Sequence, residues 1–240
     1  MAIDYSIIVP AYNETAFLPR TVESIHKAMR QTPLQGELIV CDNNSNDATA
    51  ACAESLGAKV VFEPINQISR ARNTGAAQAL GRYLVFIDAD TLISPELLNE
   101  ALRRLESGRY CGGGSLVSFD HELSWAAERG LFLWNWISRN MGLAAGCFVF
   151  CRRQDFEAIG GFSEAVYASE EIWLSRQLRR LGKPRGERYT IIEDYPVQSS
   201  GRKLEWYSTG RQALLLVMLT IFPFAVRYKR LCGFWYRRPE

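Results

Sequence analysis

Short apolar runs that alternate with helix-like segments are the feature of this sequence that most restricts its fold. The runs are rich in β-branched and aromatic residues, and apolar residues recur at helical spacing between them. The four runs are Tyr5–Pro10, Glu37–Asp42, Lys59–Glu63 and Tyr83–Asp88. Runs that are apolar on both faces are typical of buried parallel strands. The alternation therefore predicts an α/β sheet with helices on both faces.

Local signals indicate where further helices and strands begin. Pro19 and the pair Ser94–Pro95 mark helix starts, because serine caps a helix and proline fits its first turn. The expected helices cover residues 18–29, Asp47–Leu56, Ile68–Leu80, Pro95–Ser107 and Glu171–Leu181. The later expected strands are Ser115–Phe119, Gly146–Cys151 and Tyr189–Glu193. The glycines Gly112–Gly114 predict a loop or a close backbone approach.

Composition narrows the classes of function. A hydrophobic content of 48% suffices for a packed core, and a formal net charge of +2 gives no reason to expect nucleic-acid binding. The two histidines, His26 and His121, lie far apart, so a histidine-rich metal site is not expected, and we interpret His121 as a surface loop residue. The six cysteines form no C-x-x-C pair, which favours a reducing compartment. Any chemistry should therefore depend on carboxylates.

Three acidic motifs follow three of the expected strands. They are Pro10-Ala11-Tyr12-Asn13-Glu14, the segment Asp42–Thr49, and Asp88-Ala89-Asp90. Parallel strands place their carboxyl ends on one edge of a sheet, so these motifs can converge on one crevice. Two carboxylates around one small residue suit Mg²⁺ or Mn²⁺, which takes its other ligands from phosphates and water. The motifs therefore predict a phosphate-bearing substrate.

In this order, the motifs SIIVPAYNE, DNNSNDAT and ARNTGAAQALGRYLVFIDAD, with GGF and an acidic pair after them, resemble the family 2 nucleotide-sugar glycosyltransferases. The resemblance spans about residues 4–200. It implies a GT-A fold, a Rossmann-like mixed sheet flanked by helices in a single α/β domain. It also implies inverting transfer of a sugar from a nucleotide-diphosphate donor, most often of UDP or GDP. The acceptor would be a hydroxyl of a glycan or a lipid-linked molecule.

The resemblance assigns roles to individual residues. Those that would contact the nucleoside are Pro10, Ala11, Tyr12, Glu14 and, for the base, Asp42. In the Asp88-Ala89-Asp90 motif, Asp88 would face the ribose. Asp90, with Asp88 beside it, would bind the Mg²⁺ or Mn²⁺ that bridges the donor diphosphate.

An acidic pair supplies the candidate general base. Gly160-Gly161-Phe162 followed by Ser169-Glu170-Glu171 is similar to the family's G-G-F…E-D segment, whose second acid maps onto Glu171. The family usually has Asp at that place, so the longer side chain leaves Glu170 and Glu171 as alternatives. The residues alone also allow a structural role, because two acids in the first turn of a helix stabilise its dipole.

Two other classes of function stay open. FIDADT also fits the D-x-D-x-T nucleophile motif of haloacid-dehalogenase phosphatases, although that motif usually lies on an early strand. A non-catalytic nucleotide-sugar-binding protein that kept the fold is the second alternative.

Several basic and aromatic residues have two interpretations each. Residues 199–203 either supply charge to the diphosphate or form a basic surface loop, and Arg70 and Arg72 either contact the nucleotide or solvate a helix. The segment Leu116–Met141 is expected to shape the acceptor site. Its tryptophans would stack on a sugar, contact lipid or belong to the core, and they are Trp125, Trp134 and Trp136.

The chain ends in an apolar and basic tail. We expect a catalytic domain over residues 1–205 and a helical tail over 206–240. The apolar stretch Gln212–Val226 would rise roughly 22 Å as a helix, which is short of a membrane span. Residues 172–240 hold 14 Lys and Arg against 5 Asp and Glu, a charge of +9, whereas residues 1–171 carry −7.

The tail favours peripheral adsorption to a membrane, with a core or dimer-interface helix as the alternative. The N-terminus MAIDYSIIVP has no basic n-region and no long apolar h-region, so we expect a cytoplasmic protein without a signal peptide.

Overall fold

The structure is a computed structural model that describes residues 2–121, 123–201, 226–228 and 232. Most of the expected tail over 206–240, including nearly all of its apolar stretch, thus lies outside the described residues. In the described part of the chain, no helix combines the length and the apolar character that crossing a membrane requires.

One mixed sheet of eight strands forms the centre of the molecule, in the order β3-β2-β1-β4-β7-β6-β8-β5. The strands are β1 (Tyr5–Ala11), β2 (Gly36–Asp42), β3 (Lys59–Phe62), β4 (Tyr83–Ile87), β5 (Thr91–Leu92), β6 (Tyr110–Phe119), β7 (Phe148–Arg152) and β8 (Arg188–Ser199). The first four in spatial order are parallel, and β7 runs antiparallel to both of its neighbours. The predicted α/β fold with a mixed sheet is confirmed.

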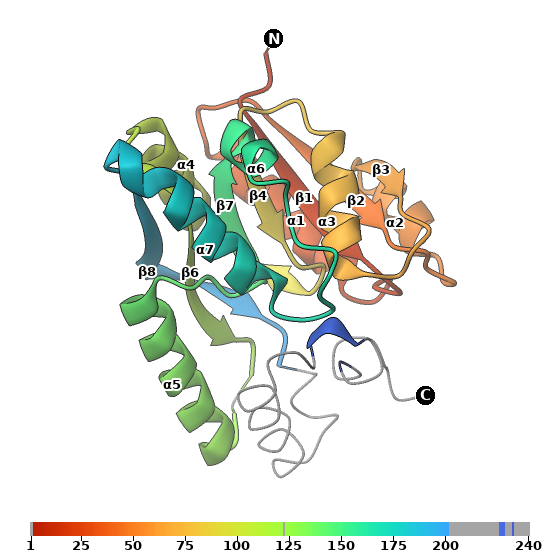
Figure 1. Ribbon diagram of the computed structural model, residues 1–240. Helices are drawn as coiled ribbons and strands as arrows, with labels where there is room; N and C mark the ends of the chain where they lie inside the picture. Colours follow the sequence, from red (N-terminus) through yellow and green to blue (C-terminus); the bar gives the residue numbers. More distant parts are fainter. Residues whose placement is uncertain (1, 122, 202–225, 229–231, 233–240) are drawn as a thin grey trace.

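Helices cover both faces of this sheet (Figure 1). They are α1 (Leu18–Arg30), α2 (Thr49–Ser55), α3 (Ile68–Ala77), α4 (Pro95–Glu106), α5 (Trp125–Met141), α6 (Arg153–Ala158) and α7 (Glu170–Gly182). Alternate side chains of β1 enter different cores: Ile7 and Val9 pack with α1 and α4, whereas Ile8 packs with α3, α6 and α7. Burial on both faces explains why β1 is a continuous apolar run.

The structure corrects several predicted elements beyond residue 108. Gly112–Gly114 lie inside β6 and not in a loop, and β8 extends well past Glu193. The tryptophan-rich stretch is the helix α5, which begins after the Ser124 cap and ends at Gly142, where φ is 60°. That stretch lacked the usual helix signal because its apolar residues lie on more than one face.

The glycines of β6 allow three backbones to approach closely, as one of the two sequence interpretations expected. A Cβ atom on Gly112 would lie 2.7 Å from the carbonyl oxygen of Phe150 on β7. Real Cβ atoms do not come this near to a backbone oxygen, so a larger residue would displace a strand.

Gly112→Ala should therefore lower the free energy of unfolding by about 1–3 kcal/mol, as overpacking of a core does. Gly130→Ala in α5 is the matched control, because nothing lies within 4 Å of its Cβ position. That change should stabilise the protein by up to about 1 kcal/mol, since alanine favours a helix more than glycine. Urea denaturation of both variants measures the difference, and equal effects would contradict this account of β6.

Candidate active site

The loops after β1 and β2 interlock through hydrogen bonds. The N–H of Asn13 donates to Ser45 Oγ at 3.0 Å, and the N–H of Glu14 donates to Thr49 Oγ1 at 2.8 Å. In return, Asn13 Oδ1 accepts from the N–H of Asn46 at 2.9 Å. Asn13 has a φ of 52°, which asparagine tolerates better than most residues. The first two acidic motifs are thus held side by side.

The residues expected at the nucleoside differ in how accessible they are. Pro10 and Ala11 are buried ends of β1, paired with Cys41 and Asp42, and the Ala11 side chain belongs to the core. Tyr12 is partly exposed, and Glu14 is buried. Asp42 is also buried, and its Oδ1 accepts from the N–H of Ser45 at 3.3 Å.

The Asp88-Ala89-Asp90 motif follows β4 on the same edge of the sheet. Ala89 is buried, and its carbonyl accepts from Thr21 Oγ1 at 2.9 Å. The carbonyl of Asp90 accepts from the N–H of Ser200 at 3.1 Å, which brings the end of β8 beside the motif. Arg202 and Lys203, expected to add charge here, lie outside the described residues.

Arg72 of α3 connects the third motif to the acidic pair. Its side chain is 1% exposed. Nη2 donates to Asp88 Oδ1 at 2.8 Å and to the carbonyl of Gly146 at 2.9 Å, and Nη1 donates to Glu170 Oε1 at 2.5 Å. Its guanidinium also lies 5.0 Å from the centre of the Phe162 ring. One buried cation therefore brings together segments that are far apart in the sequence.

The acidic pair begins α7, and its two members have different surroundings. Glu170 is buried against Arg72, whereas Glu171 is not one of the ion-pair partners of Arg72. The Glu171 carboxylate lies beside Gly146, where a Cβ atom would be 3.6 Å from its Oε2. Burial and the adjacent charge of Glu170 raise the pKa of Glu171 well above the usual range of a carboxyl group, although Arg72 opposes this shift.

Side chains of α3 also hold the segment that leads to the acidic pair. Asn73 accepts from the N–H of Phe162 at 2.9 Å and donates to its carbonyl at 3.0 Å. Gln67 Nε2 donates to the carbonyls of Glu164 and Val166 at 2.8 and 2.9 Å. The G-G-F motif therefore docks on α3, which fixes where α7 can start.

Arg72 is the residue whose role sequence reasoning missed. A signal was present, because Ser69, Arg72 and Ala76 share one face of the helix, and both neighbours are small residues suited to packing on a sheet. Gly146 was also missed as a site residue, since its role depends on the side chains that approach it. Arg70 binds Glu63 and Glu164 near the surface.

The atoms that could bind a metal ion near the Asp88-Ala89-Asp90 motif are oxygen atoms. Among the residues described, no three His, Cys, Asp or Glu side chains cluster as a complete metal cage. Arg72 uses one oxygen of Asp88, whose side chain is 22% exposed, and Asp90 lies on the same turn. Two carboxylates without a full cage fit a Mg²⁺ or Mn²⁺ ion that shares its ligands with a diphosphate.

The sequence profile of Glycosyl transferase family 2 matches residues 6–160, which is more than half of the chain. The chain therefore belongs to this family. That membership confirms the resemblance in the motifs and removes the basis for the phosphatase interpretation of Asp88–Thr91.

Curated proteins and solved structures of glycosyltransferases are similar to this chain. The 4,4'-diaponeurosporenoate glycosyltransferase of Staphylococcus haemolyticus is 35% identical over 104 residues, which cover 40% of this chain and 27% of that protein. The mannosyltransferase PcManGT of Pyrobaculum calidifontis, solved with GDP-Man and Mn²⁺, has a TM-score of 0.67 at 19% identity, covering 90% of this chain and 63% of that one. TarS 1-349 of S. aureus has a TM-score of 0.63 at 18% identity, covering 94% and 65%.

The matching region spans about a third or less of the curated relatives' own length. The solved structures share the GT-A fold of this chain.

Loss of the Arg72 cation should strongly destabilise the protein. Arg72→Leu would leave Asp88 and Glu170 as uncompensated carboxylates, so we expect the free energy of unfolding to fall by about 3–5 kcal/mol. Arg70→Leu, on the same helix, removes ion pairs of a side chain that is 33% exposed and should lower it by about 1 kcal/mol or less. Urea denaturation compares them, and similar losses would show that Arg72 is not the anchor.

Proposed function

We propose that this protein is an inverting glycosyltransferase that moves a sugar from a nucleotide-diphosphate donor, of UDP or GDP, to an acceptor hydroxyl. The observation that carries the proposal is the double ion pair of Arg72, which unites Asp88 at the end of β4 with Glu170 at the start of α7. Among the similar structures, one holds GDP-Man with Mn²⁺ and one holds UDP, which supports this class of donor.

The donor would lie along the carboxyl edge of the parallel strands. Tyr12, Glu14 and Asp42 line the nucleoside end, where Pro10 and Ala11 form the floor and Asp42 recognises the base. Asp88 faces the ribose, and its carboxylate is held in place by Arg72. The acceptor would be a hydroxyl of a glycan or of a lipid-linked molecule.

Asp90, with Asp88, would hold the Mg²⁺ or Mn²⁺. A divalent ion neutralises the charge that develops on the departing diphosphate. The role of the protein is to fix the two carboxylates on a turn whose backbone is anchored on both sides. Thr21 binds the carbonyl of Ala89 and Ser200 binds the carbonyl of Asp90.

Glu171 is the general base in this proposal. The Glu170 carboxylate is committed to its ion pair with Arg72, whereas burial and the adjacent charge of Glu170 raise the pKa of Glu171. A carboxylate with a raised pKa accepts the proton of an attacking hydroxyl more readily. Attack from the side of Glu171, opposite the diphosphate, would invert the anomeric carbon.

The catalytic domain would comprise residues 1–205, followed by a tail over 206–240. We propose that the protein works in the cytoplasm, where nucleotide sugars would be its donors.

Two substitutions separate metal binding from proton transfer. Asp90→Ala should abolish release of UDP or GDP from a donor sugar in Mn²⁺, because the diphosphate charge is no longer neutralised. Glu171→Gln should keep the thermal shift caused by the nucleotide but lower transfer by roughly 10²–10⁴-fold. Glu157→Gln, the same change at an exposed acid on α6, should leave the rate unaltered.

Full turnover in Asp90→Ala would contradict the metal assignment. Loss of turnover in Glu170→Gln but not in Glu171→Gln would assign the role of general base to Glu170. Stabilisation by nucleotides without turnover of any UDP or GDP sugar would favour the non-catalytic alternative.

The pH dependence of transfer tests the surroundings of Glu171. Only the ionised carboxylate of Glu171 can accept a proton, and this form predominates above the raised pKa of the group. We therefore expect kcat to rise about tenfold per pH unit below that pKa and to level off above it. The midpoint should lie well above about 4.3, the value of an unperturbed glutamate. Stopped assays at saturating donor and metal measure it, and a flat profile down to pH 5 would contradict the assignment.

A further inference from the structure

The outer face of α5 exposes large aromatic side chains. Trp125, Phe132 and Trp136 are 71%, 72% and 54% exposed, and their spacing of seven and four residues places them on one face of the helix. Leu133, next to this face, is 56% exposed. Arg129 lies within the same stripe, with its guanidinium 5.2 Å from the centre of the Trp125 ring.

This exposure is not needed to hold α5 on the fold. The opposite face of the helix packs Leu131 and Trp134 against the core. Asn135 accepts from the N–H of Val117 at 3.1 Å and donates to its carbonyl at 2.9 Å. The helix is thus anchored without its outer aromatics, and large apolar side chains exposed together on one face mark an interaction surface.

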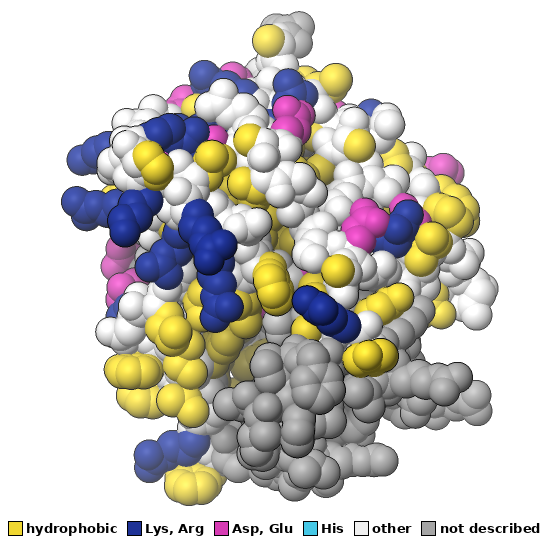
Figure 2. Space-filling model, in the orientation of Figure 1, with side chains coloured by type: hydrophobic (Ala, Val, Ile, Leu, Met, Phe, Trp, Pro, Cys, Tyr) yellow, Lys and Arg dark blue, Asp and Glu magenta, His cyan; other side chains and the backbone are white. Residues whose placement is uncertain are grey.

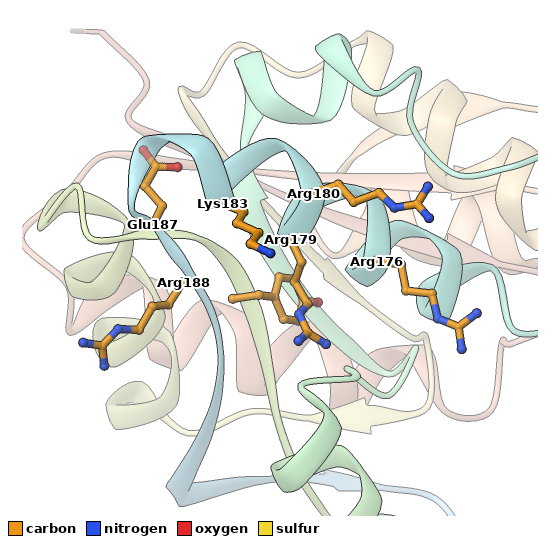
Figure 3. Close-up of a pocket in the computed structure, with 7 residues that line it drawn as sticks. Arg176, Arg179, Arg180, Lys183, Glu187 and Arg188 are labelled. Carbon is orange, nitrogen blue, oxygen red and sulfur yellow. The ribbon is translucent and has the colours of Figure 1, made fainter.

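A basic groove lies along α7, whose Arg179 contacts the C-terminal end of α5. A cavity of about 520 Å³ lies between α7 and the start of β8, and five cations line it (Figure 3): Arg176, Arg179, Arg180, Lys183 and Arg188. Glu187 is the acid in its lining, and that carboxylate is bound by Arg152 and Arg185 on its other side. The net charge of the groove is therefore strongly positive.

The two surfaces belong to one side of the molecule. Arg179 donates to the carbonyl of Met141, the last residue of α5, so the basic helix and the aromatic helix are in contact. In Figure 2 the dark blue side chains gather over α7, and yellow side chains lie directly below them over α5. Trp173, Arg176 and Arg180 follow one another at helical spacing on α7, and all three are exposed.

We propose that this combined surface of α5 and α7 docks the protein on an anionic lipid bilayer. Tryptophan and phenylalanine on one helical face suit insertion at the boundary between headgroups and acyl chains. Arginine and lysine beside them suit the phosphates and carboxylates of anionic headgroups. The charge of the groove on α7 and the exposed aromatics of α5 together match a bilayer, which presents negative charge next to hydrocarbon.

The position of α7 connects this surface to the proposed chemistry. Its first turn carries Glu170 and Glu171, and its later turns carry the basic residues. A protein docked through this face would hold its acidic pair near the bilayer surface, where a lipid-linked hydroxyl would be presented. Docking itself requires no turnover, so it is tested apart from the proposed function.

Sedimentation of the full chain with lipid vesicles tests the proposal. We expect binding to vesicles of phosphatidylcholine with 30% phosphatidylglycerol in roughly tenfold excess over pure phosphatidylcholine. Arg176→Glu with Arg180→Glu should lower the binding constant by at least about tenfold. Lys27→Glu with Arg30→Glu makes the same change in net charge on exposed positions of α1, which packs in a different core from α7, and should alter binding by less than about twofold.

A second variant examines the aromatic patch. Phe132→Ser with Trp136→Ser alters exposed side chains, so the fold should be kept, and binding to the anionic vesicles should also fall about tenfold or more. Near-ultraviolet circular dichroism and the nucleotide-induced thermal shift verify that each variant is folded, so a loss of docking is distinguished from a loss of donor binding.

Three results would overturn the proposal. Undiminished vesicle binding by both double variants would assign adsorption to another part of the chain, such as the tail. Absence of vesicle binding, with a dimer that Phe132→Ser with Trp136→Ser dissociates, would show that a second copy covers the patch. Release from vesicles by inorganic phosphate at an ionic strength where chloride has no effect would identify a site for small phosphates.

Discussion

The buried guanidinium of Arg72 is the constraint on which the rest of the site depends. A charge removed from water is tolerated only where partners compensate it, and here two carboxylates and a backbone carbonyl do so. These partners come from the turn after β4, the loop before β7 and the first turn of α7. Any displacement of one segment would leave a buried charge uncompensated, so the three segments hold a common geometry.

That geometry also explains why two adjacent acids behave differently. Glu170 forms an ion pair with Arg72, and its charge helps to raise the pKa of Glu171. The Glu171 carboxylate lies beside Gly146. Ser169, immediately before them, has a φ of 61°, which is uncommon for a residue with a side chain. The docking of G-G-F on Asn73 holds the chain that leads to this turn. The proposed base, Glu171, and the carboxylate that binds Arg72, Glu170, are thus neighbours in the sequence.

The helix α7 carries opposite charges at its two ends. Acids lie in the first turn of α7 and arginines in its last turn, an arrangement that also stabilises the helix dipole. The acidic end contacts Arg72 and Gly146, and the basic turns are exposed next to the end of α5. A helix of thirteen residues can therefore separate the proposed donor chemistry from the proposed membrane contact.

Apolar periodicity by itself located β1 to β4 and α1 to α4, although not the two-residue strand β5. The strands β1, β2 and β4 were clear because they are largely buried on both faces and must be apolar. Motif order determined the family. Only the tertiary structure decided three features: the strand position of Gly112–Gly114, the helix α5 and the role of Arg72. Each depends on which backbone or charge approaches from a distant segment, as Phe150 approaches Gly112 and Asp88 approaches Arg72. Local sequence encodes which face of an element is apolar, whereas the partner of a buried charge is set by how those elements pack.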